Sequence, residues 1–115
     1  MIMQLNKVLE NWDKGDDPIL HNSPNLIVAH GQEDLPCIQE DCHIALTYFE
    51  LYVFSKGLGT CWAGFLNSAA NSYFPVIEAM KLPKGHKCFG AVMIGYPENS
   101  YHLIPKRKPA CVTFY

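Results

Sequence analysis

The sequence predicts one small domain of mixed helix and sheet, an α/β or α+β sandwich rather than a helix bundle. Patterns typical of helices alternate along the chain with two short apolar runs typical of strands. The chain has 115 residues, a length that forms one domain and buries about two-thirds of its unfolded surface. Residues 1–115 are therefore expected to form a single domain, without internal repeats or low-complexity tracts.

The composition predicts a partner surface. Apolar and aromatic residues make up 49% of the chain, whereas charged residues make up only 17%, against a typical value of about 25%. A small domain with so few charges is expected to cover part of its surface with a partner, most simply a second copy. The net charge of -2 argues against a nucleic-acid partner. The apolar runs are too short and interrupted to span a membrane, and no signal peptide is visible, so the sequence predicts a cytoplasmic protein.

The cysteines predict free thiols rather than disulfides or a metal site. The five cysteines are Cys37, Cys42, Cys61, Cys88 and Cys111. Their number is odd and no CxxC motif occurs, which favours free thiols in a reducing compartment. The pairs Cys37/Cys42-His43 and His86/Cys88 lack the close spacing of zinc ligands, so no metal is expected.

The first third of the chain predicts a helix and then a strand. Residues 2–13 place apolar side chains three or four apart and predict an amphipathic helix. The turn residues 14–18 end it. Residues 26–30, Leu-Ile-Val-Ala-His, form a continuous apolar run that is typical of a strand buried on both faces.

Residues 41–56 predict a helix that is apolar almost all round. From Ile44 to Phe54 only Thr47 and Glu50 are not apolar or aromatic. Asp41 suits an N-cap, and the stop signal comes from Gly57 and Gly59. Such a helix must be covered on nearly every side, so we expect it to form the centre of a dimer contact. Glu50 is expected to be paired or to lie at the rim of an interface rather than to be catalytic.

The remaining elements are shorter. Residues 66–80 predict a helix in two pieces, because Pro75 is tolerated in a first turn but not in the middle of a helix. Residues 88–96 predict a second strand, which Pro97 ends. The prolines of residues 101–109 predict an extended segment. Residues 111–115 alternate in a strand-like pattern and are expected to pack on this sheet or on that of a neighbouring copy.

Two features remain as candidates for chemistry, because no catalytic triad, paired carboxylates, P-loop or G-x-G-x-x-G motif can be placed. The first is the loop Gly57–Gly64, Gly-Leu-Gly-Thr-Cys-Trp-Ala-Gly, whose backbone would let a ligand lie against main-chain N–H groups. The second is the basic run 106–108, which would suit a phosphate. A tight connection and a solvated basic face are the plainer alternatives. Cys61 has no histidine at a motif spacing, so a packing role is expected for it.

Three segments resemble the C-terminal part of the FMN-dependent nitroreductase family, in particular a branch of anaerobic bacteria and archaea that is often fused to a ferredoxin domain. The segments are KVLENWDKGDDPILHNSPNLIVAH, EDCHIALTYFELYVFSKGLGTCWAGFL and LPKGHKCFGAVMIGYPENSYHLIPKRKP. The apolar helix, the GLGTCW loop, the GYP turn and the RKP segment occur together and in this order. The resemblance covers nearly the whole chain.

The resemblance implies an α+β fold, part of a nitroreductase-like three-layer sandwich, and a homodimer that packs its long helix at the two-fold axis. FMN would lie at the dimer interface against residues 60–64, with the N–H of Ala63 toward flavin N5 and Gly64 beside it. Arg107, and secondarily Lys106, would contact the phosphate. The implied cofactor-binding residues are Thr60, Cys61, Trp62, Ala63, Gly64, Lys106 and Arg107.

The implied activity is an FMN-dependent oxidoreductase. Electrons would pass from NAD(P)H or a ferredoxin-like protein donor to a small organic acceptor. The flavin would carry this chemistry, so no catalytic side chain is expected.

The departure from the family lies at the start of the chain. Relatives begin with a basic Arg-Arg-Ser type segment and a Pro-Ser-x-x-Asn-x-Gln-Pro type loop, and both contact the cofactor. This chain starts at the helix that follows them, so it resembles an N-terminally truncated nitroreductase that holds FMN weakly. The alternative is a truncated, non-catalytic dimeric binding or structural module that has lost part of the flavin site, or one that a separate polypeptide completes.

Overall fold

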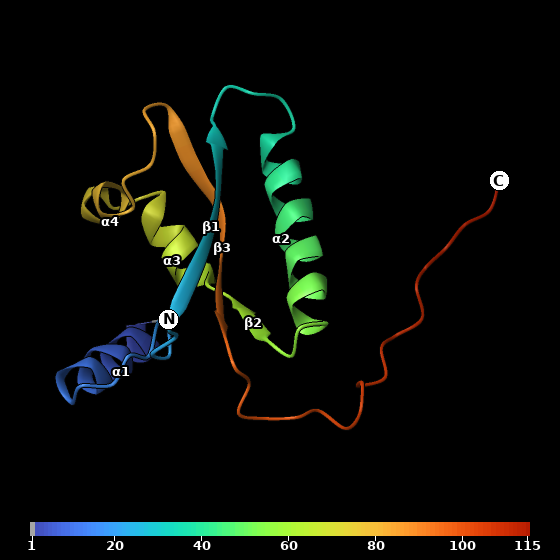
Figure 1. The fold of residues 1–115 in the computed structure, drawn as a ribbon, viewed down its shortest axis with the longest axis horizontal. Coiled ribbons are helices and arrows are strands. Elements are labelled where there is room, and N and C mark those ends of the chain that lie inside the picture. The colour runs from blue at the N-terminus through green and yellow to red at the C-terminus, as the bar shows by residue number, and fades with distance from the viewer. Residues whose placement is uncertain (1) are drawn as a thin grey trace.

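The fold is built from four helices and three strands within the described residues. The computed structural model describes residues 2–115, and their side chains from Asn6 onward. In chain order the elements are α1 (Ile2–Asp13), β1 (Asn25–Gln32), α2 (Ile38–Phe54), β2 (Gly59–Trp62), α3 (Gly64–Ala70), α4 (Phe74–Ala79) and β3 (His86–Gly95) (Figure 1). The strands form one antiparallel sheet in the order β1-β3-β2. Among these helices none has the length and apolar content needed to cross a bilayer.

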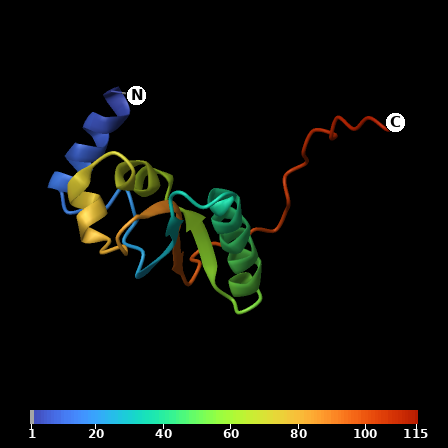
Figure 2. The same cartoon turned by 90° about the horizontal axis from the view of Figure 1, so that it is seen from above.

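The sheet lies between two layers of helix, so the α+β prediction is confirmed. The long helix α2 covers one face, and α3 with α4 lies on the other (Figures 1 and 2). On the α2 face, Leu46 packs directly over Gly90 of β3. On the opposite face, Ala91 and Met93 pack with Leu66 of α3. The core therefore lies on both sides of β3, the central strand.

Helix α2 was predicted to be apolar almost all round, and it carries apolar side chains both toward the sheet and on the side that faces away from it. Its side toward the sheet buries Cys42, Leu46 and Val53. Its other side exposes large side chains, and Tyr48 and Leu51 keep 74% and 69% of their surface accessible. Within this single chain only one of the two apolar sides is covered.

The prediction of Asp41 as the N-cap of α2 is wrong. The helix begins at Ile38, after Cys37 in a left-handed conformation with φ 61°. The N–H of Asp41 already donates to the carbonyl O of Cys37 at 2.9 Å, so Asp41 lies inside the first turn. A carboxylate there is still favourable, because it faces the positive end of the helix dipole.

The predicted stop at Gly57 is confirmed. Gly57 has φ 77°. Its N–H donates to Phe54 O at 3.0 Å, and the N–H of Leu58 donates to Val53 O at 3.1 Å. These two bonds form a Schellman motif, which needs a left-handed residue and so favours glycine. The motif turns the chain directly into β2.

The predicted strands β1 and β3 are both present. Strand β3 is buried along most of its length, including Val92, which is fully buried. Strand β1 is not buried on both faces as predicted, since Leu26 and Ile27 each keep 36% of their surface exposed. The reason is that β1 lies at the edge of the sheet and pairs only with β3.

Helices α3 and α4 confirm the prediction of two helical pieces. Pro75 lies in the first turn of α4, where its missing N–H costs no helical hydrogen bond. The first piece begins at Gly64, two residues earlier than the predicted start at residue 66.

The C-terminal tail leaves the sheet. Residues 97–115 have no helix or strand, and their side chains are exposed. Figure 1 shows the tail running away from the sheet toward its free end. The prediction that residues 111–115 add a strand is therefore wrong for the sheet of the same chain, and their packing on a second copy stays a prediction.

Replacing Gly90 by Ala should destabilise the fold. An added Cβ would lie 2.6 Å from Leu46 Cδ1 and 3.2 Å from Trp62 Cζ3. Overpacking of this kind costs about 1–3 kcal/mol. We expect this loss in the free energy of unfolding, measured by urea denaturation.

The matched control is Gly64→Ala. A Cβ at Gly64 would meet no atom within 4 Å, so the stability of this variant should equal that of the wild type. Equal stability of Gly90→Ala and Gly64→Ala would contradict the close packing at Gly90.

Candidate functional site

The predicted loop Gly57–Gly64 contains a strand. Residues Gly59–Trp62 form β2, which pairs antiparallel with β3 from Gly59 opposite Gly95 to Trp62 opposite Val92. The prediction of a loop throughout this segment is therefore wrong. Thr60 and Trp62 carried the missed signal, because β-branched and aromatic residues at alternate positions favour a strand.

Alternate side chains of β2 face opposite layers of the fold. Ala63, which follows β2, packs with Ala91 and Met93 on the α3 side. Thr60 and Trp62 point the other way and reach α2, where both bind the carboxylate of Glu50. These bonds confirm that Glu50 is paired, which is one of its two predicted positions, although the sequence did not indicate its partners.

The indole of Trp62 lies between α2 and β3. Its ring stands edge-on to His43, with 5.8 Å between the ring centroids. Atom Cζ3 lies 3.2 Å from the place where a Cβ on Gly90 would be. The ring of His43 is fixed in turn, because its Nε2–H donates to the carbonyl O of Phe89 at 2.9 Å. Trp62 keeps 41% of its surface exposed, so one part of the indole still faces solvent.

The backbone of β2 offers donors at the open edge of the sheet. The N–H of Ala63 donates to the carbonyl O of Ala91 at 2.8 Å. It is thus used inside the sheet and is not free for flavin N5, contrary to what the resemblance implies. In an antiparallel pair the N–H groups alternate in direction, so those of Thr60 and Trp62 point to the outer side of β2. Beside them, Gly64 leaves open space around its Cα.

A cavity of about 490 Å³ lies beside the start of β2, and two of the predicted residues, Thr60 and Cys61, line it. Its other walls come from the segment before β1, the end of β3 and the start of the tail. The full lining is Leu20, His21, Asn22, Ser23, Pro24, Gly59, Thr60, Cys61, Met93, Ile94, Gly95, Tyr96, Pro97, Glu98, Asn99 and Tyr101. Cys61 is exposed here, so the predicted packing role for this thiol is wrong.

One wall of this cavity is held by Asp17. Its Oδ1 accepts the backbone N–H groups of Ile19 at 3.0 Å and Leu20 at 2.9 Å, and its Oδ2 accepts that of Asn22 at 3.3 Å. These backbone bonds, with that of Leu20 the strongest, lower the pKa of Asp17. The ionised carboxylate thus fixes the turn that leads into β1.

The structure does not bring the basic residues to β2. Lys106 and Arg107 lie on the exposed tail, which leaves the body of the molecule in both views (Figures 1 and 2). Of the predicted cofactor-binding residues, the five from Thr60 to Gly64 are contiguous at one edge of the sheet, and the two cations lie apart from them in this chain.

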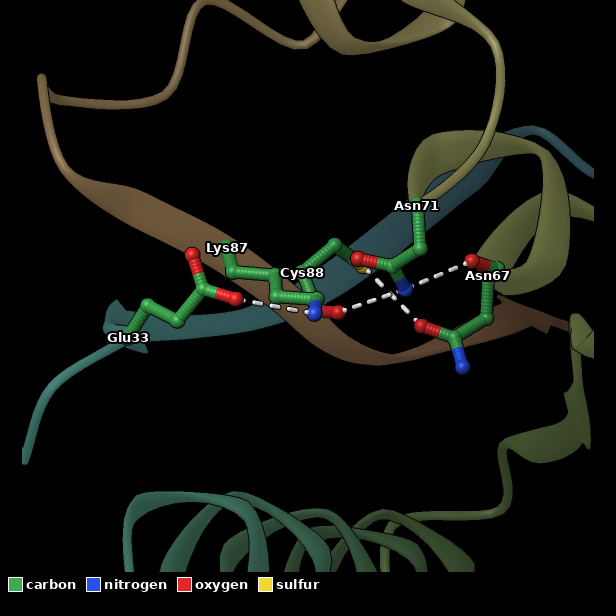
Figure 3. Close-up of polar contacts among 5 residues, drawn as sticks. All are labelled: Glu33, Asn67, Asn71, Lys87 and Cys88. Carbon is green, nitrogen blue, oxygen red and sulfur yellow. Dashed lines mark hydrogen bonds and ion pairs between the residues drawn. The ribbon is translucent and has the colours of Figure 1, made fainter. Parts of the chain in front are cut away.

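A second polar cluster ties α3 to β3 (Figure 3). The thiol of Cys88 donates to Asn67 Oδ1 at 3.3 Å, while Asn71 Nδ2 donates to the carbonyl O of Cys88 at 2.9 Å. Nearby, Lys87 and Glu33 form an ion pair at 3.0 Å. Burial raises the pKa of the Cys88 thiol, and it likewise raises that of Cys42. Neither thiol is thus a ready nucleophile. Among the described side chains no group of three or more His, Cys, Asp or Glu could hold a metal.

Alkylation should separate the cysteines into two classes. Cys37, Cys61 and Cys111 are exposed, whereas Cys42 and Cys88 are buried. Since burial both shields the buried thiols and raises their pKa, we expect iodoacetamide at neutral pH to modify Cys42 and Cys88 only after denaturation. Mass spectrometry of peptides from native and denatured protein measures this. Rapid labelling of Cys88 in the native protein would contradict the packing of β3 against α3.

The comparisons with known proteins identify the family of this fold. A model described as the nitroreductase family matches residues 2–96. No curated protein matches the chain with significance.

Several solved structures share the fold. A nitroreductase with bound FMN from Bacteroides fragilis is 20% identical, with a TM-score of 0.69, and the match covers 92% of this chain and 60% of that one. A nitroreductase-like family protein from Bacillus cereus is 26% identical, with a TM-score of 0.62 and coverage of 88% and 56%. An FMN-dependent nitroreductase from Clostridium difficile is 25% identical, with a TM-score of 0.60 and coverage of 81% and 57%.

The chain thus spans less than two thirds of the length of these structures. The family match nevertheless includes all seven helices and strands, from α1 to β3. The chain belongs to the nitroreductase family.

Proposed function

We propose that this chain acts as an FMN-dependent oxidoreductase of the nitroreductase type. Electrons would pass from NAD(P)H or a protein donor to a small organic acceptor. The observation that carries the proposal is the family match over residues 2–96, which includes β2 and its open edge. Two of the similar structures, from B. fragilis and C. difficile, are described as FMN-bound or FMN-dependent.

The residues at the edge of β2 suit a flat, hydrogen-bonding ligand. The outward N–H groups of Thr60 and Trp62 can donate to acceptors along the edge of a flavin ring. The open space at Gly64 permits close approach of a ring to the backbone. When bound, FMN supplies the electron-transfer chemistry, and the protein supplies binding and orientation. This division of roles is consistent with the lack of an acid–base pair among the predicted site residues.

The phosphate of FMN would be held by Arg107, assisted by Lys106. A guanidinium binds phosphate through two parallel hydrogen bonds, which an ammonium cannot do. Both side chains are exposed on the tail, so this contact requires the tail to pack back over β2 or to reach the site of a second copy.

The chain would act as a homodimer that is built on the exposed side of α2. Ile44, Tyr48 and Leu51 follow one another at helical spacing on that side and are 67%, 74% and 69% exposed. A contiguous apolar stripe of this kind marks a protein interface. Residues 111–115, which are exposed and alternate in a strand-like pattern, would pack on the partner.

Titration with FMN tests the cofactor and its phosphate contact. We expect the wild type to bind FMN saturably with a dissociation constant in the micromolar range. Binding is measured by the quenching of flavin fluorescence. Arg107→Ala should weaken binding by about one to two powers of ten, because a hydrogen bond to a charged group contributes roughly 1.5–3 kcal/mol. Gly64→Ala should also weaken binding, because its Cβ would fill the open space at β2.

The control for Arg107→Ala is Lys84→Ala, which removes an exposed cation from the turn before β3 and should leave the affinity unchanged. Saturable binding that is equal in the wild type and Arg107→Ala would exclude the phosphate contact. A wild type that binds no FMN would contradict the proposed function and favour a non-catalytic module.

Charge introduced on the exposed side of α2 should dissociate the dimer. Tyr48→Asp and Leu51→Asp would bury an unpaired carboxylate at the contact, which is costly, whereas both side chains face solvent in a single chain. We expect light scattering at micromolar concentration to give a dimeric mass for the wild type and a monomeric mass for both variants. Gln39→Asp, at an exposed polar position in the first turn of α2, is the control and should remain dimeric. If light scattering gives a compact monomer for the wild type, the proposed dimer is wrong.

A further inference from the structure

The carboxylate of Glu50 binds both side chains that β2 turns toward α2. Glu50 Oε1 accepts the hydroxyl of Thr60 at 2.9 Å, and Oε2 accepts the indole Nε1–H of Trp62 at 2.8 Å. Glu50 lies one turn from both Leu46 and Val53, on the row of α2 that packs against the sheet. A half-buried carboxylate in this position is stable because each of its oxygens has a donor.

These two bonds hold β2 from the face that α2 covers, whereas the sheet holds β2 only along the edge that pairs with β3. Strand β2 has only four residues and pairs with β3 alone, so its outer edge has no neighbouring strand among the described residues. An edge strand of this length is held in place by few backbone bonds. Glu50 adds two further attachments, and it is itself carried by a helix of 17 residues.

The residues that Glu50 holds are also the residues that present the open edge. Thr60 and Trp62 direct their side chains to Glu50, and their N–H groups point away from β3. The direction of these N–H groups is thus tied to the position of one carboxylate. The indole N–H can only donate, so its orientation depends on an acceptor at this place.

We propose that Glu50 is a positioning residue that sets the orientation of the β2 edge for the flavin. The role is indirect: Glu50 acts through Thr60 and Trp62 and needs no contact with the cofactor. This inference rests on the proposed function, because the β2 edge is the surface to which FMN is assigned. It predicts that removal of the carboxylate loosens Trp62 in the free protein and weakens FMN binding.

The first measurement uses the free protein. Trp12 and Trp62 are the two tryptophans, so in a Trp12→Phe background all tryptophan emission comes from Trp62. Glu50→Ala should shift that emission to the red and lower its anisotropy, because the indole loses its acceptor. Glu50→Gln should restore both signals, since its amide oxygen can accept the indole N–H and its NH₂ can donate to the Thr60 hydroxyl.

The second measurement is FMN affinity in the same proteins. We expect Glu50→Ala to bind FMN roughly tenfold more weakly, a loss typical of one hydrogen bond, and Glu50→Gln to recover most of the affinity. Glu40→Ala is the matched control, because Glu40 lies exposed in the first turn of α2, and it should change neither signal. If Glu50→Ala does not fold by circular dichroism, Glu50→Asp serves instead, because its shorter side chain draws the carboxylate away from the indole N–H while Trp62 remains as the reporter.

The outcomes separate the inference from the proposed function. If Trp62 emission is unchanged in Glu50→Ala, Glu50 does not hold the indole in place and the inference is wrong. A changed emission with FMN affinity equal to that of the wild type overturns the positioning role and leaves the proposed function intact. A wild type without FMN affinity overturns both. Red-shifted Trp62 emission of lower anisotropy together with weaker FMN binding in Glu50→Ala, and recovery of both properties in Glu50→Gln, supports the inference.

Discussion

The close approach of α2 to β3 at Gly90 is the constraint on which the other features of this fold depend. Leu46 of α2 and the indole of Trp62 both occupy the space beside Gly90 that a side chain would fill. Because the indole fits there, Trp62 can turn toward α2 and reach Glu50. With Trp62 on that side, strand alternation places Ala63 in the opposite core and directs the N–H groups of Thr60 and Trp62 to the open edge. The lack of a Cβ at Gly90 thus determines which side chains of β2 face α2 and which of its N–H groups face the open edge of the sheet.

The sequence predicted those elements whose signals are local. Helix α1, the stop of α2 at Gly57, the break at Pro75 and strand β3 depend on spacing, on glycine or proline and on a continuous apolar run. Each of these signals acts within a few residues. The start of α2 was misplaced because Asp41 is a good cap, yet the chain begins the helix one turn earlier, after Cys37.

The missed features depend on contacts between distant residues. Strand β2 is short and rich in small residues, and it forms only because β3, about thirty residues further along the chain, pairs with it. The exposure of β1 follows from its place at the edge of the sheet, which its own apolar run does not reveal. The candidate site likewise combines a segment that the sequence indicates with features that depend on distant contacts. The resemblance indicated the segment Thr60–Gly64, but the direction of the Ala63 N–H and the attachment through Glu50 required the register of the sheet and the position of α2.

The two apolar sides of α2 have a consequence for how the chain behaves at low concentration. If the exposed side of α2 is the contact of the proposed homodimer, part of the folding free energy would come from a second molecule, and that part would scale with the logarithm of protein concentration. Dilution would then act as a mild denaturant, and the melting temperature would differ between dilute and concentrated samples. A newly synthesised chain would expose the apolar side of α2 until it dimerised. The cellular concentration of the protein would therefore influence the fraction that escapes aggregation and proteolysis.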